Sequence, residues 1–141
     1  MKKVPTSLHE AIAQRDVSSV DPSFFPDNPT TTPIIEAMKV KCPYIMFLLH
    51  NRGADLARTD KNGRNALHHA ALRNDIISIN FLINRKCPKD ARDNSGFTPL
   101  VLAIWKNNLA NVRILVKNGV TVYPEQGPLH SMPLVTAAYF V

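Results

Sequence analysis

The stretch Asp60-Lys61-Asn62-Gly63-Arg64-Asn65-Ala66-Leu67-His68-His69-Ala70 decides the fold, because its pattern returns 33 residues later as Asp93-Asn94-Ser95-Gly96-Phe97-Thr98-Pro99-Leu100-Val101-Leu102-Ala103. The same step leads back from Asn65-Ala66-Leu67 to Thr32-Pro33-Ile34. A fixed period of this size indicates a repeat architecture, in which each repeat is one supersecondary unit that buries its apolar face against its neighbours.

Each copy carries the signals of two helices. In Thr98-Pro99 the Thr hydroxyl can accept a hydrogen bond from the free amides that open a helix, and Pro suits the first helical position. Small alanines at positions 37, 70, 103 and 137 allow close approach of neighbouring helices. In a second segment, from Ile76 to Leu82, apolar residues recur at the spacing of a helix. Because Asn62-Gly63 is a strong tight-turn signal, we predict that each unit is turn, helix, turn, helix.

The turn after each second helix has a glycine in two units of three. Gly53 and Gly119 are 66 residues apart, and Lys86 occupies the position midway between them. Glycine at this point ends a helix with a left-handed residue. We therefore expect a positive φ at Lys86 and some loss of stability in the middle unit.

These segments resemble the ankyrin repeat, whose motif is Thr-Pro-Leu-His-x-Ala on a period of about 33 residues. The resemblance implies an all-α solenoid of stacked helix-turn-helix units joined by short β-hairpin-like loops. It places complete units near 30–59, 60–92 and 93–125, and a truncated unit from 126, so that residues 30–141 form the array. Residues 1–29 are interpreted as a degenerate N-terminal capping repeat.

The motif histidine is present at His68, whereas Ile35 and Val101 replace it in the units on either side. In the family this histidine hydrogen-bonds along the stack, so we expect packing to join the units that lack it. Adjacent helical residues point about 100° apart, and we therefore interpret His68 as structural and His69 as exposed. No zinc-ligand spacing, phosphate-binding glycine loop or nucleophile elbow occurs. We expect no catalytic residue, cofactor or metal site, and enzymatic activity is disfavoured.

The composition suits a soluble domain: 45% of the 141 residues are hydrophobic and 20% are charged. The longest uncharged apolar stretch is far shorter than the roughly 20 residues that span a bilayer, so no membrane insertion is expected. The two cysteines, Cys42 and Cys87, are too few for a disulfide scaffold. We interpret them as buried or half-buried thiols, in a cytoplasmic and possibly nuclear protein.

The net charge is +6, and residues 60–92 alone carry +4. One interpretation of this basic cluster is a solvated turn. The other is a patch that steers an acidic partner towards the protein. Nucleic acid is disfavoured, because aromatic and basic residues do not alternate as stacking platforms require.

Ankyrin-like arrays usually bind partners through the hairpin tips and the inner face of the first helices. Alignment of the units places 13 candidate partner-binding residues at these positions. They are Lys39, Val40, Lys61, Asn62, Arg64, Leu72, Arg73, Asn94, Phe97, Trp105, Lys106, Tyr139 and Phe140. Apolar anchors flanked by cations are typical of interface hot spots. The alternative for Trp105 is packing on its own repeat.

The sequence thus predicts a scaffold or adaptor module that binds an acidic protein or peptide and takes no small-molecule substrate. The alternative is a substrate-recognition arm of a larger regulatory protein, such as a ubiquitin-ligase adaptor. Residues 134–141 end one helix into a unit without a charged side chain. Because an uncapped solenoid end exposes core, we also expect possible self-association through this end.

Overall fold

The computed structural model describes residues 31–39 and 43–122. This part of the chain contains six helices and no strand, as the all-α prediction requires. They are α2 (Pro33–Lys39), α3 (Pro43–Asn51), α4 (Ala66–Leu72), α5 (Ile76–Asn84), α6 (Pro99–Trp105) and α7 (Leu109–Lys117).

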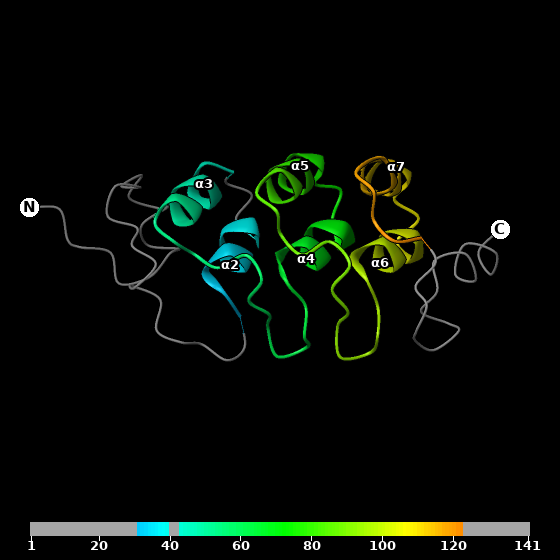
Figure 1. The fold of residues 1–141 in the computed structure, drawn as a ribbon, viewed down its shortest axis with the longest axis horizontal. Coiled ribbons are helices and arrows are strands. Elements are labelled where there is room, and N and C mark those ends of the chain that lie inside the picture. The colour runs from blue at the N-terminus through cyan, green and yellow to red at the C-terminus, as the bar shows by residue number, and fades with distance from the viewer. Residues whose placement is uncertain (1–30, 40–42, 123–141) are drawn as a thin grey trace, which may run out of the picture.

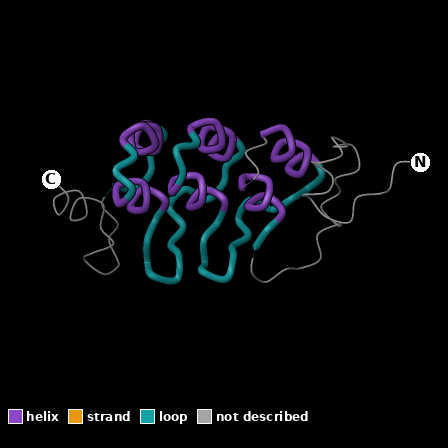
Figure 2. Tube along the Cα trace, turned by 180° about the vertical axis from the view of Figure 1, so that it is seen from behind, coloured by secondary structure: helices purple, strands orange, loops and turns teal. Residues whose placement is uncertain are grey.

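The helices form two rows that run along the stack (Figure 1). The inner row is α2, α4 and α6, and the outer row is α3, α5 and α7. The loops that join successive units extend away from the outer row, all on the same side (Figure 2). In the described residues, the stretches 30–59, 60–92 and 93–125 each contain one pair of helices, and the loops ahead of α4 and α6 lie side by side.

The first helix of each unit begins where the sequence predicts. Thr32 and Thr98 each accept a hydrogen bond through Oγ1, from the amides of Ile35 (3.3 Å) and Val101 (3.4 Å). Asn65 replaces Thr in the middle unit, and its Oδ1 accepts from the amide of His68 at 3.1 Å. These side chains satisfy amides that have no partner within the helix.

The core runs between the two rows of helices. The repeated alanines Ala37, Ala70 and Ala103 are fully buried, as are the leucines that recur on the outer row, Leu49, Leu82 and Leu115. Alanine at the inner positions lets neighbouring helices approach, while leucine fills the space between the rows. The register predicted from the sequence is therefore confirmed.

The turn prediction is also confirmed. Gly53 and Gly119 have φ of +92° and +75°, and Lys86 takes the same left-handed conformation with φ of +59°. A residue with a Cβ is strained in this region by about 1–2 kcal/mol. The Lys86 side chain is exposed, so no packing contact requires a lysine at this position.

Hydrogen bonds between units supplement the packing. His68 Nδ1 accepts from the amide of Asn65 at 3.2 Å, so its Nε2–H donates to the carbonyl of Phe97 in the next unit at 3.0 Å. The unit at 30–59, which lacks the motif histidine, is not joined to the next unit by packing alone. Arg73 donates from Nη1 to the carbonyl of Met38 at 3.3 Å, and Cys87 donates from Sγ to the carbonyl of Leu56 at 3.4 Å.

Asn111 on α7 makes the densest of these cross-unit contacts. Its side chain is fully buried. The Nδ2 group lies 3.3, 3.2 and 2.6 Å from the carbonyl oxygens of Ala70, Ala71 and Arg73, at the end of α4. Helix ends leave carbonyls without intrahelical partners, so this amide caps α4 from the neighbouring unit. The repeat pattern does not single out this residue.

Candidate protein-binding surface

Trp105 is the largest exposed side chain at the ends of the inner helices, with 46% of its surface accessible. Its ring lies 4.6 Å from the ring of Phe97, centroid to centroid, at an interplanar angle of 54°. Phe97 belongs to a small second core with Val101 and Leu102, against which Leu72 packs. Both interpretations of Trp105 therefore hold in part. The side chain packs on its own repeat, and about half of its surface remains accessible to solvent.

Three cations lie at or next to the ends of the inner helices. Lys39 Nζ is 2.7 Å from Glu36 Oε1, within the same helix. Arg73 is held by its bond to the carbonyl of Met38. Lys106 follows Trp105 as the exposed residue that ends α6. Lys39, Leu72, Arg73, Trp105 and Lys106 are thus the last residues or C-caps of α2, α4 and α6, the three helices of the inner row (Figure 1).

The hairpin tips are tied to one another. The amide of Asn94 donates to the carbonyl of Asn62 at 2.9 Å, and Asn94 Nδ2 donates to the carbonyl of Lys61 at 3.0 Å. Arg64 Nε pairs with Asp93 Oδ2 at 3.1 Å, where the carboxylate is almost completely buried. Lys61, Asn62 and Asn94 remain exposed, so the two linked tips offer polar side chains to a partner.

Phe97 differs from its expected place at a hairpin tip. Its side chain is only 8% exposed, because it packs beneath Trp105 and beside Leu72. Phe97 supports the surface from below and offers little area for direct contact. The prediction of an exposed side chain here is wrong, since the aromatic ring turns towards the core of its own unit.

His69 is not exposed either, contrary to the interpretation from helical geometry. Its Nε2 lies 2.7 Å from Asp60 Oδ2, a pair with side-chain exposures of 18% and 6%. Burial lowers the pKa of His69 below its ordinary value, although the Asp60 carboxylate opposes this shift. Burial acts to raise the pKa of Asp60, but bonds from the Arg64 and Asn62 amides and from His69 outweigh it and lower the pKa. Because a carboxylate oxygen can only accept, His69 Nε2 carries the hydrogen of this bond and donates it to Asp60.

Three of the predicted partner-binding residues, Val40, Tyr139 and Phe140, lie outside the described residues. The truncated unit from 126, the proposed self-association end and the capping repeat at 1–29 lie there too. Their roles stay predictions.

The described residues hold no group of three or more His, Cys, Asp or Glu side chains that could bind a metal ion. Cys87 is buried, as predicted, and burial raises the pKa of its thiol to about 11. Since the thiolate is the reactive form, this cysteine is inert at neutral pH. Cys42 lies outside the described residues.

Residues 25–125 match the family model for ankyrin repeats in three copies. The chain belongs to the ankyrin repeat family. The ankyrin repeat is a non-catalytic fold that mediates protein–protein interaction, and the row of inner-helix ends and hairpin tips is the part of this repeat array that the sequence predicted to bind.

Relatives share this array over part of their length. Over 80 residues the chain is 31% identical to Palmitoyltransferase AKR1 of Lachancea kluyveri, which covers 57% of this chain and 11% of that protein. It is 34% identical over 98 residues to Protein glp-1 of Caenorhabditis elegans, covering 64% and 7%. It is 31% identical over 88 residues to the 26S proteasome non-ATPase regulatory subunit 10 of Dictyostelium discoideum, covering 61% and 38%. The matched region is thus well under half of each relative.

None of the helices in the described ranges is long and apolar enough to cross a membrane.

Proposed function

We propose that this chain is an adaptor module that binds an acidic protein or peptide through the row of inner-helix ends and the hairpin tips. The observation that carries the proposal is Trp105, half exposed and braced on Phe97 at 4.6 Å. A rigid aromatic side chain offers a large contact area at a small entropy cost, and Trp and Arg are enriched among hot spots. Lys39, Arg73 and Lys106 add positive charge at the ends of the same row of helices.

The acidic character of the partner follows from charge. Residues 60–92, which include α4 and its hairpin, carry a net charge of +4 in a chain of +6. Complementary charge speeds association and suppresses wrong partners. The binding surface would operate in the cytoplasm or nucleus and would require no cofactor or small-molecule substrate.

A substrate-recognition arm of a larger regulatory protein, such as a ubiquitin-ligase adaptor, is the second candidate. The three relatives described above are all much longer than the region they share with this chain. An arm of this kind would use the same surface, so the two candidates differ in what is attached to the array.

The test is affinity capture with the full chain, followed by mass spectrometry and quantitative binding to the captured protein. Trp105→Ala should weaken binding by about 2 kcal/mol or more while the fold is retained. Lys106→Glu should mainly slow association and reduce its salt dependence. Leu109→Ala, an exposed apolar residue on the outer row, is the matched control. Equal capture by wild type and Trp105→Ala would contradict the proposal.

A further inference from the structure

A second surface lies on the opposite side of the array, on the outer helices α3 and α5. These helices are side by side in both views (Figures 1 and 2). Neither contains an Asp, Glu, Lys or Arg residue, whereas α7 in the same row carries Arg113 and Lys117. Four large apolar side chains are nevertheless accessible on the pair: Tyr44 (57%), Phe47 (39%), Ile76 (37%) and Ile77 (65%). Exposed apolar side chains gathered in this way mark interaction surfaces.

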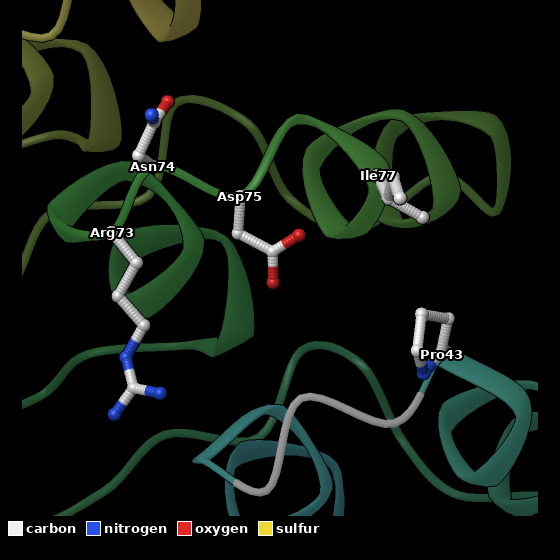
Figure 3. Close-up of a pocket in the computed structure, with 5 residues that line it drawn as sticks. All are labelled: Pro43, Arg73, Asn74, Asp75 and Ile77. Atoms are coloured by element: carbon white, nitrogen blue, oxygen red, sulfur yellow. The ribbon is translucent and has the colours of Figure 1, made fainter.

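One end of this surface is hollowed. A pocket of about 500 Å³ is lined by Pro43 at the start of α3, by Arg73, Asn74 and Asp75, and by Ile77 on α5. Figure 3 shows Pro43 and Ile77 on facing sides of this space. Asp75 is the N-cap of α5. Its Oδ1 accepts a hydrogen bond from the Ser78 amide at 3.0 Å, and its Oδ2 accepts one from the Ser78 hydroxyl at 2.5 Å. The pocket therefore offers an incoming side chain the apolar residues Pro43 and Ile77, beside the polar Arg73, Asn74 and Asp75.

The other end carries positive charge. The Arg85 guanidinium carbon lies 5.9 Å from the ring centre of Phe47 on α3 and 5.4 Å from that of Phe81 on α5. Stacking on two rings holds the cation in place. Arg85 and its neighbour Lys86 are both exposed. The accessible surface of α3 and α5 thus runs from the pocket at Pro43 and Ile77, past Tyr44 and Phe47, to the Arg85 cation, and we call this surface the outer groove.

We propose that the outer groove binds an amphipathic, acidic helix of a partner protein. Two adjacent helices present ridges and grooves that accept a third helix, with its apolar face on the groove. A helix of nine residues is about 13 Å long, so an occupant of about three turns fits the length of α3 and α5. Its apolar side chains contact Tyr44 and Ile77, and a carboxylate at one end pairs with Arg85. A second copy of this chain is disfavoured by its net charge of +6.

The probe is a labelled synthetic peptide helix with leucine on one face and glutamate on the other, titrated with the full chain by fluorescence anisotropy. Matched peptides carry glutamine or lysine in place of glutamate. The leucine–glutamate peptide should bind most tightly and the leucine–lysine peptide least. Arg85→Gln should remove the difference between the glutamate and glutamine peptides, because it removes the cation that pairs with the carboxylate.

Two lysine substitutions test the position of the groove. Ile77→Lys should raise the Kd of the leucine–glutamate peptide about tenfold or more. Leu109→Lys on α7 is the matched control, because its side chain is 63% exposed against 65% for Ile77, and it should change the Kd less than about twofold. Circular dichroism melting of both variants establishes that each remains folded.

Several results would overturn the proposal. The proposal fails if no peptide binds, if the lysine peptide binds most tightly, or if Ile77→Lys and Leu109→Lys raise the Kd equally. The surface would be assigned to a membrane instead if the wild-type protein sedimented with anionic lipid vesicles, Ile77→Lys did not, and both bound the peptide equally well. Trp105→Ala should leave peptide binding unchanged. Loss of binding in that variant would place the peptide on the opposite face, against this proposal but not against the adaptor function.

Discussion

Gly63 lies against Asn94 of the next hairpin. A Cβ added at Gly63 would come within 2.9 Å of the Asn94 amide nitrogen and still closer to Asn94 Oδ1. That amide is the one that donates to the carbonyl of Asn62 at 2.9 Å. Two separate requirements thus act on Gly63: its φ of +73° and the close approach of two hairpins from different units.

Gly63→Ala should therefore destabilise the protein by at least about 1 kcal/mol more than Gly53→Ala. Both substitutions strain a left-handed backbone, by about 1–2 kcal/mol. Only Gly63 faces another backbone, since a Cβ at Gly53 would meet nothing within 4 Å. Urea unfolding of the two variants measures the difference. Equal losses would mean that the hairpins separate freely to accept a methyl group.

Lys86→Gly should leave the stability unchanged or raise it by up to about 1 kcal/mol. The substitution relieves the left-handed strain but adds conformational freedom to the unfolded chain. Asn107, at φ of +52°, is the natural comparison, because asparagine tolerates this region better than lysine. Asn107→Gly should gain less than Lys86→Gly in thermal melting. Clear destabilisation by Lys86→Gly alone would contradict the strain argument.

Leu100→Ala should cost about 2–5 kcal/mol, the range for large-to-small changes in a core. Leu100 is 1% exposed, at the start of α6. Leu109→Ala removes the same atoms from an exposed site on α7 and should stay within about 0.5 kcal/mol of wild type. Denaturant titration of both variants is the measurement. A loss below about 0.5 kcal/mol for Leu100→Ala would show that its burial does not stabilise the stack.

Stability should fall as the pH is lowered below about 6.5. Burial lowers the pKa of His68 below its ordinary value of 6.5, against the opposing bond to the Phe97 carbonyl. The unfolded state then binds more protons than the folded state once the pH falls below 6.5. The stabilisation is therefore fully present above this pH and is lost as the pH falls towards the folded-state pKa. The lowered pKa of His69 acts in the same direction.

Melting temperatures measured between about pH 7.5 and 5.5, across the ordinary pKa of histidine, test this expectation. His68→Gln should show a smaller drop over this range than wild type, because one of the two depressed histidines is gone. Each variant is compared with itself at the higher pH, so its own loss of packing does not enter. A wild-type protein with no pH dependence over the range would contradict the neutral, buried assignment of His68.

Local sequence signals predicted part of the candidate surface. The position of Trp105 in the repeat predicts an outward side chain, and it is half exposed. The hairpin-tip position of Phe97 also predicts an outward side chain, but Phe97 is buried, because it contacts Trp105 of its own unit and lies in a small core against which Leu72 of the preceding unit packs. Whether a residue at a given repeat position supports the surface or forms it depends on the side chains of the adjacent unit.

The sequence by itself determined the repeat period, the helix starts and the turn that holds Lys86 in a left-handed conformation. These are local properties: a cap, a proline or a turn acts on residues within a few positions of itself. The tertiary structure decided the contacts that lie beyond these local signals. It paired His69 with Asp60 within one unit, set the buried amide of Asn111 against the end of α4 in the preceding unit, and left Ile77 exposed while burying Ile79. Periodicity marks a residue as helical and apolar, but the side of the helix that meets the next unit exists only once the units are stacked.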